Sequence, residues 1–181
     1  MSSTTDQPES SQSDWIRLLL KRHERTLILY SARLLGDVDR ARDVVQEAFL
    51  RLCTQERAEL EDRVDVWLFT VCRNLCHDVH RKESRMTPLE EERADQTATS
   101  AATPIEVAAR DDSYSAVLES MTSLPAKQQE VLRLKFQSGL SYKEISRVTN
   151  ESMGNVGWLL HTGLKSLRQK LGASETKGAQ A

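Results

Sequence analysis

The chain has few of the residues that mark several common classes of protein. Its three cysteines, Cys53, Cys72 and Cys76, are too few for a disulfide framework and are typical of a reducing compartment. None of its 181 residues lies in an apolar run near the roughly 18 residues that a membrane span needs. The polar first residues lack the pattern of a secretory signal. We therefore expect no membrane insertion and a cytoplasmic location.

Glycine, proline and aromatic residues are also scarce. There are 7 glycines and 4 prolines, and aromatic residues make up 5% of the chain. Leucine outnumbers valine and isoleucine together by 23 to 16. Because leucine favours helices and β-branched residues favour strands, this balance predicts an all-α fold.

The sequence motifs of common enzymes are absent as well. There is no Gly-rich phosphate loop, no H-E-x-x-H, no C-x-x-C and no G-x-S-x-G. Cys72, Cys76 and His80 share a helical spacing, but structural zinc takes four ligands and no fourth candidate is evident. We therefore expect no enzymatic activity, no metal, no cofactor and no small-molecule substrate.

The net charge of −2 conceals an uneven distribution of charged residues. Residues 86–112 contain 7 acidic and 2 basic residues, whereas residues 113–172 contain 4 acidic and 8 basic residues. A basic block can bind nucleic acid, and it can equally be a solvated helical surface. Charge alone leaves both interpretations open.

Apolar periodicity predicts two blocks of helices separated by an acidic linker. Ser13 is a candidate N-cap of the first helix. The expected helices span about 14–35, 37–53 and 66–85 in the first block, and 105–121, 125–137, 141–148 and 152–171 in the second. The predicted domains are therefore 14–86 and 105–172, with 87–104 as a flexible linker and with 1–13 and 173–181 disordered.

The second block contains the pattern of a helix-turn-helix. Ser141 and Glu144 are spaced as a capping box, the turn falls at 149–151, and Ser152 can cap the longer helix that follows. On that helix the predicted core face contains Met153, Val156, Leu160, Leu164, Leu167 and Leu171. The predicted outer face contains Trp158, His161 and Lys165, with Asn155 and Thr162 at its edge. This face can reach phosphates and base edges, or it can be the wet side of a helical hairpin.

The helix predicted at 66–85 has a similar division. Its apolar side contains Leu68, Val71, Cys72, Leu75, Cys76 and Val79, and its other side is polar and basic. Such a face suits an unpaired DNA strand, whose backbone binds cations and whose bases stack on planar groups. An ordinary amphipathic helix explains the same pattern.

Three segments in order resemble a known family. Residues 30–52 read YSARLLGDVDRARDVVQEAFLRL, residues 66–82 read VWLFTVCRNLCHDVHRK, and residues 124–171 begin LPAKQQEVLRLKFQSGLSYKEIS and end LKSLRQKL. Together they resemble a bacterial RNA polymerase sigma factor of the extracytoplasmic-function (ECF) type. The resemblance implies two helical domains joined by a flexible linker, the second containing a helix-turn-helix, and it implies an alternative sigma factor.

The resemblance also implies partners and roles for particular residues. The implied partners are core RNA polymerase, through its clamp and flap regions, promoter DNA and an anti-sigma factor. The residues that correspond to the polymerase-binding helix are Asp39, Asp43, Gln46, Glu47 and Arg51. Those that correspond to the reader of the −10 element are Trp67, Arg73, Asn74, His77, Asp78 and Arg81. Those that correspond to the reader of the −35 element are Ser152, Asn155, Trp158, His161, Thr162 and Lys165.

One departure from the family keeps two other interpretations open. The −35 helix of family members commonly carries a Thr-Val-Lys-Ser-Arg-like run, whereas residues 155–159 here read NVGWL and lack the basic pair. A polymerase-binding decoy without promoter recognition would fit this loss. A stand-alone helix-turn-helix regulator would fit the second domain but would leave the first without a role.

Overall fold

The computed structural model describes residues 8–60, 62–86, 117–118 and 120–178, and these residues form helices joined by short turns. The first domain consists of four helices, which are α1 (Pro8–Leu35), α2 (Val38–Cys53), α3 (Arg57–Leu60) and α4 (Val64–Met86). The expected all-α fold is confirmed for the described part of the chain. No helix among these residues is long and apolar enough to cross a lipid bilayer.

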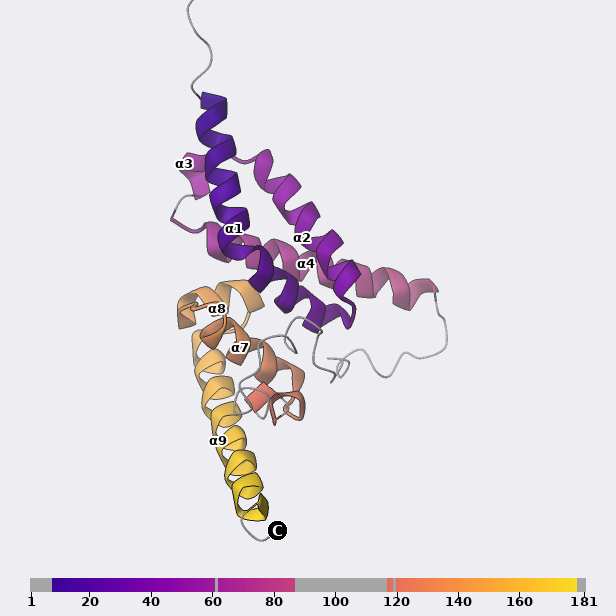
Figure 1. The fold of residues 1–181 in the computed structure, drawn as a ribbon, viewed down its shortest axis with the longest axis vertical. Coiled ribbons are helices and arrows are strands. Elements are labelled where there is room, and N and C mark those ends of the chain that lie inside the picture. The colour runs from indigo at the N-terminus through magenta and orange to yellow at the C-terminus, as the bar shows by residue number, and fades with distance from the viewer. Residues whose placement is uncertain (1–7, 61, 87–116, 119, 179–181) are drawn as a thin grey trace, which may run out of the picture.

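The turn between α1 and α2 follows from its local sequence. Gly36 has a positive φ of 72°, which glycine adopts at little cost and which ends α1. The Asp37 side chain then accepts hydrogen bonds from the backbone N–H groups of Asp39 and Arg40, and so caps α2. The two helices therefore lie side by side as an antiparallel pair (Figure 1).

The core of the first domain is formed where α4 crosses this pair. Leu27 of α1, Leu52 of α2 and Leu68 of α4 are all fully buried. Tyr30 and Phe69 meet edge to face, with ring centroids 5.3 Å apart. The polar ring of His80 also ties α4 to α1, because its Nε2 lies 2.8 Å from the carbonyl oxygen of Leu34. These contacts hold the outer face of α4 at a defined angle to α2.

The second domain contains the predicted helix-turn-helix. Residues 117–118 and 120–122 are helical, and α7 (Ala126–Phe136), α8 (Tyr142–Thr149) and α9 (Met153–Gly178) follow. The capping box of Ser141 and Glu144 is confirmed in both of its hydrogen bonds. Asn150 takes the left-handed conformation, with φ 58°, and turns the chain between α8 and α9.

The two domains touch each other. Helix α8 packs against α4, and α7 contributes Glu130 to a cluster with residues of α1 and α4. Figure 1 shows α7 and α8 directly beside the crossing of α1 and α4. A residue of the first domain can therefore be covered by the second.

Three expectations about the helices need correction. Helix α1 begins at Pro8, so Ser13 lies inside the helix rather than at its N-cap, and residues 8–13 are helical. Helix α9 continues to Gly178, through residues that we expected to be disordered. Met153 is 57% exposed and is not part of the core, because it is the first residue of α9. The predicted linker, 87–104, and residues 105–116 of the next predicted helix lie outside the described residues.

Candidate polymerase and nucleic-acid interfaces

The predicted polymerase-binding residues lie along the outer side of α2. Asp39, Asp43 and Gln46 are exposed and recur at helical spacing. Two ion pairs lie along the same helix. Asp39 accepts a hydrogen bond from Arg42 at 2.7 Å, and Glu47 accepts one from Arg51 at 2.8 Å. The result is a polar stripe that is open to solvent along most of the helix.

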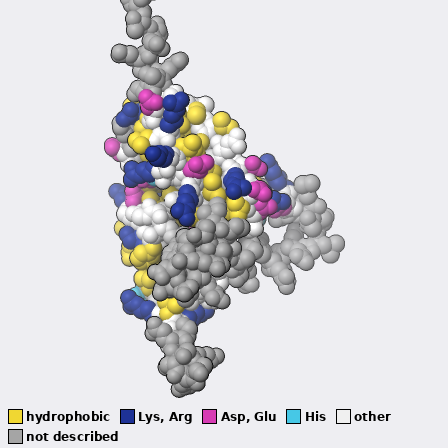
Figure 2. All heavy atoms as spheres, in the orientation of Figure 1, with side chains coloured by type: hydrophobic (Ala, Val, Ile, Leu, Met, Phe, Trp, Pro, Cys, Tyr) yellow, Lys and Arg dark blue, Asp and Glu magenta, His cyan; other side chains and the backbone are white. Residues whose placement is uncertain are grey.

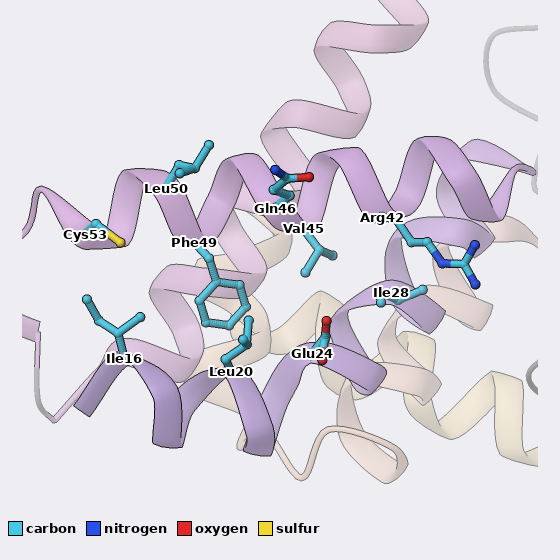
Figure 3. A pocket seen from close by; sticks show the side chains of 10 residues that line it. All are labelled: Ile16, Leu20, Glu24, Ile28, Arg42, Val45, Gln46, Phe49, Leu50 and Cys53. Carbon is cyan, nitrogen blue, oxygen red and sulfur yellow. The ribbon is translucent and has the colours of Figure 1, made fainter. Parts of the chain in front are cut away.

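An apolar groove of about 430 Å³ runs beside this stripe, between α1 and α2. In Figure 3 the Phe49 ring lies between the two helices and points toward Leu20, while Leu50 points away from α1. Leu50 is 57% exposed and lies one turn from Gln46, which also lines the groove. Exposed leucine beside charged residues is typical of a protein-binding surface.

The outer face of α4 contains most of the residues predicted to read the −10 element. Asn74, His77 and Arg81 are exposed, and Arg81 donates to the partly buried Asp78 at 2.7 Å. Burial lowers the pKa of His77, and the nearby Arg73 guanidinium lowers it further, so the ring is neutral near pH 7. Trp67 is half-buried against the core rather than fully outward. The polar face is therefore present, with its tryptophan partly withdrawn.

Arg73 differs from Arg81 on this face, because its partner belongs to the second domain rather than to α4 itself. Its Nε donates to the Glu130 carboxylate at 2.8 Å. Tyr30 Oη donates to the same carboxylate oxygen at 2.8 Å. Arg73, which is predicted to read the −10 element, is thus bound to the second domain across the domain boundary.

The start of α9 is held by polar contacts of its own. Ser152 Oγ accepts from the backbone N–H of Asn155 at 3.1 Å, which confirms its capping position. The Asn155 side-chain amide donates to Glu151 at 2.6 Å, and Glu151 also pairs with Lys127 at 3.1 Å. Asn155 is therefore oriented by the turn that precedes the helix.

The next turns of α9 present the remaining −35 candidates. Trp158 is 59% exposed, and His161 and Lys165 are exposed on the same side. Thr162 is partly buried, and its hydroxyl donates to the Trp158 carbonyl at 2.8 Å. A large aromatic side chain on an open helical face has apolar surface available for a partner.

Sequence reasoning missed a second aromatic residue on this face. Tyr142 is 45% exposed, and Lys135 Nζ lies 5.6 Å from the centre of its ring. A Cβ on Gly157 would lie 3.8 Å from the Tyr142 ring, so Tyr142 and α9 form one surface. Its position at the start of α8 was visible in the sequence, but its proximity to Gly157 depends on the fold.

Sequence reasoning also missed Glu130 and Tyr30. Each lies in a helix of ordinary amphipathic composition, and the two are 100 residues apart. No local signal relates them. Only the docking of the second domain on the first, where α8 packs against α4, brings them together.

The cysteines of α4 are structural. Burial raises the pKa of Cys72 and of Cys76 to about 12, so both remain neutral thiols in the core. The part of the chain that the structure describes contains no cluster of residues that would hold a metal ion.

Charge is mixed over the surface of the first domain. In the view of Figure 2, basic and acidic side chains are intermingled where α1 and α2 lie at the surface, and hydrophobic side chains are exposed between them. A mixed surface favours docking by matched pairs and apolar contacts over binding to a uniform polyanion.

Comparisons with known proteins agree with this arrangement. The chain matches the family described as sigma-70 region 2 over residues 19–86 and that described as sigma-70 region 4 over residues 114–167. The first match lies in the first domain and the second match lies mostly in the second domain, as in a sigma-70-like protein.

Two curated relatives are similar over most of their length. The chain is 30% identical to the ECF RNA polymerase sigma factor SigL of Mycobacterium tuberculosis, with 91% of this chain and 95% of that protein aligned. It is 28% identical to the ECF RNA polymerase sigma factor SigW of Bacillus subtilis, with 77% and 79% aligned. The chain belongs to the family of ECF sigma factors.

A solved structure has the same fold. The sigma factor RpoE of Bartonella quintana, crystallised with the anti-sigma factor NepR, superimposes with a TM-score of 0.66 at 22% identity. The match covers 87% of this chain and 96% of that one. Members of the family are alternative sigma factors, which direct promoter recognition and transcription initiation. This chain contains both region 2 and region 4.

Proposed function

We propose that this sigma factor divides its work among three helical faces. The exposed side of α2 binds core RNA polymerase at the clamp, with Asp43 and Gln46 at its centre and Leu50 seated as an apolar anchor. Mixed charge beside an apolar groove supports a protein partner for this face rather than DNA. The second domain contacts the flap region of the polymerase.

The outer face of α4 binds the −10 element as it melts. Arg73 and Arg81 hold phosphates, and the planar side chains of Asn74 and His77 lie where bases can stack or hydrogen-bond. The neutral state of His77 suits stacking, because a neutral imidazole is cheaper to desolvate than a charged one. The observation that best supports this role is that the polar face lies on a helix whose opposite side packs into the core.

The outer face of α9 binds the −35 element in the major groove. Asn155, Trp158 and Lys165 lie on one side of the same helix, as a recognition helix requires. Two of these three side chains are uncharged, so the face contributes few phosphate contacts and binds duplex DNA weakly by itself. Attachment of both domains to the polymerase makes the second contact intramolecular and restores affinity.

The polymerase carries out the chemistry, and this chain supplies the choice of promoter. It therefore acts where the polymerase is, in the cytoplasm, and is not itself an enzyme. The RpoE relative was crystallised with an anti-sigma factor. We propose a partner of the same class for this chain.

The decisive experiment reconstitutes the chain with core RNA polymerase and transcribes a pooled genomic promoter library. Discrete start sites with shared −10 and −35 sequences would establish the proposed function. Binding without transcripts would favour a polymerase-binding decoy, which the missing basic pair at residues 157–159 also fits. Failure to bind the polymerase would favour a stand-alone DNA-binding regulator.

Variants then separate the three faces. The pair Asp43→Ala and Gln46→Ala should weaken polymerase binding, whereas Asn74→Ala should leave binding intact and slow promoter opening. Trp158→Ala should reduce transcription from promoters that depend on a −35 element, while polymerase binding and promoter opening stay unchanged. Circular dichroism of each variant checks that the helices persist, so loss of folding is recognised separately.

A further inference from the structure

One carboxylate joins the two domains of the free chain. The same oxygen of Glu130, on α7, accepts hydrogen bonds from Tyr30 Oη of α1 and from Arg73 Nε of α4, each at 2.8 Å. Tyr30 and Arg73 belong to the first domain and Glu130 belongs to the second. The contact is therefore a link between domains that are separate in sequence.

The link is withdrawn from solvent. The side chains of Arg73 and Glu130 are 20% and 11% exposed, and Tyr30 is buried. Burial raises the pKa of Tyr30 well above its usual value, and the Glu130 carboxylate raises it further, so Tyr30 remains a donor at any physiological pH. A shielded charge pair is screened less by solvent than an exposed one, and losing one partner is costly because it leaves the other charge buried and unpaired.

The guanidinium of Arg73 lies in the electrostatic field of the second domain. Glu130 binds Arg73 directly, and Glu151, in the turn before α9, acts on it through space and helps to raise the pKa of the guanidinium against the lowering effect of burial. A guanidinium bound by a carboxylate oxygen is in a setting similar to the one that it would have against a phosphate oxygen of DNA. The second domain thus presents acidic side chains where the proposed ligand would present phosphates.

We propose that this contact is autoinhibitory: Glu130 occupies the phosphate-binding group of Arg73, so that the free chain is closed and cannot bind the −10 strand. The proposal rests on the proposed role of Arg73 at the −10 element. Binding of that strand requires Glu130 of α7 to release Arg73 and α8 to move away from α4. The buried hydrophobic residues of the two domains form one continuous cluster, so opening the chain exposes apolar surface at the boundary as well as breaking the link.

Weak DNA binding by the free chain has two possible explanations, the closed link at Arg73 and a small number of basic residues, and they make different predictions. If few cations alone explained weak DNA binding, neutralising Glu130 would change the affinity no more than neutralising any other acidic residue. If Glu130 competes with phosphate, its neutralisation should act through Arg73 and should also separate the domains. Tyr30→Phe tests the same link without a change of charge.

The test uses the full-length chain and compares Glu130→Gln with Asp14→Asn. The control also removes one negative charge and one ion pair, because Asp14 pairs with Arg17 on the exposed start of α1. Binding of a labelled 20-nucleotide single strand of mixed sequence is followed by fluorescence anisotropy at several salt concentrations. We expect Glu130→Gln to tighten binding by roughly five- to tenfold at low salt. The slope of log K against log salt should steepen by about 0.7, the value for one added phosphate contact.

Separation of the domains is measured in the same proteins by the distance between two spin labels. One label goes on the exposed Cys53 and the other on Arg168→Cys, which is exposed on α9, while Cys72 and Cys76 are buried and unreactive. Glu130→Gln and Tyr30→Phe should both move the distribution to longer distances. Asp14→Asn should not.

Two results would overturn the proposal, and they differ in meaning. Unchanged label distances in both variants would show that the link does not hold the domains, and would leave the proposed function standing. Separation without tighter binding, or a gain that survives Arg73→Ala in the Glu130→Gln background, would show that Arg73 does not bind the strand. That second result would also remove Arg73 from the proposed −10 site.

Discussion

Gly163 of α9 lies directly against Leu132 of α7. A Cβ at position 163 would come within 3.0 Å of Leu132 Cδ1, and the Leu132 side chain is itself fully buried. The missing side chain allows the two helices to approach closely at the centre of the second domain. Gly154 and Gly157, on the same helix, have no such neighbour, since 154 is open and 157 meets only the edge of Tyr142 at 3.8 Å.

The three glycines should therefore respond in different ways to alanine. Gly154→Ala should stabilise α9 by about 0.5–1 kcal/mol, because alanine loses less backbone entropy on folding. Gly163→Ala should leave the protein about 1–2 kcal/mol less stable than Gly154→Ala, because the fully buried Leu132 side chain must shift to make room for the added methyl group. Urea denaturation followed by circular dichroism measures both. Equal stabilisation by the two substitutions would show that the close approach of α7 and α9 is not needed.

Position 157 can also accept the charge that the family carries near it. Gly157→Arg should fold, because its Cβ makes only ordinary contact with Tyr142. It should add one phosphate contact in the complex with polymerase and promoter, and so steepen the salt dependence of duplex binding by about 0.9. Gly157→Ala is the control, since it changes the helix without adding charge. A steeper slope in both variants would mean that helix stability, and not charge, limits binding at this face.

The pairing of Asp65 with His23 should make the first domain sensitive to acid. His23 is buried, and its Nε2 lies 3.0 Å from Asp65 Oδ1. The close contact with His23 lowers the pKa of Asp65, against the opposing effect of partial burial. A carboxyl with a lowered folded pKa stabilises the fold above its unfolded pKa of about 3.9, and this stability is lost as pH falls through the folded pKa.

Asp65→Asn should accordingly cost about 1 kcal/mol near pH 7, as expected for a half-exposed charged hydrogen bond. The difference from the unsubstituted protein should shrink as pH falls below about 4. Urea denaturation at a series of pH values measures it, with the exposed Asp62→Asn as the control for loss of charge. A constant difference across the series would indicate that Asp65 acts through packing and not through its charge.

The features that were predictable are those set by neighbouring residues. The capping box of Ser141 and Glu144 depends on groups three residues apart, and the start of α2 depends on the side chain of Asp37. The start of α1 was predicted wrongly because Ser13 has the chemistry of a cap. Pro8 fits the first turn of a helix, and Gln12 donates to the carbonyl of Gln55 at 3.1 Å, so a contact distant in sequence favours the longer helix.

The candidate −10 and −35 residues also divide into features set by local spacing and features set by contacts distant in sequence. Helical spacing placed Asn74, His77 and Arg81 on one face, because periodicity depends only on the helix that carries them. It could not show that Arg73 is bound by Glu130, which is 57 residues away. It also could not distinguish an apolar residue in the first turn of α9 from one in its core, and so it placed Met153 inside.

The groove between α1 and α2 supports a last prediction, about the polymerase-binding face. Leu50→Ser should weaken binding of core RNA polymerase by about tenfold, because burial of a leucine side chain in an interface is worth about 1.5 kcal/mol or more. Stability should hardly change, since Leu50 is mostly exposed in the free chain.

Leu18→Ser is the matched control, because Leu18 is exposed on α1 and lies half a helical turn away from the groove residues Ile16 and Leu20. Affinity measured by fluorescence titration should fall for Leu50→Ser alone. An equal loss in both variants would place the polymerase contact on a wider surface of α1 and α2, and no loss in either would move it off the groove altogether.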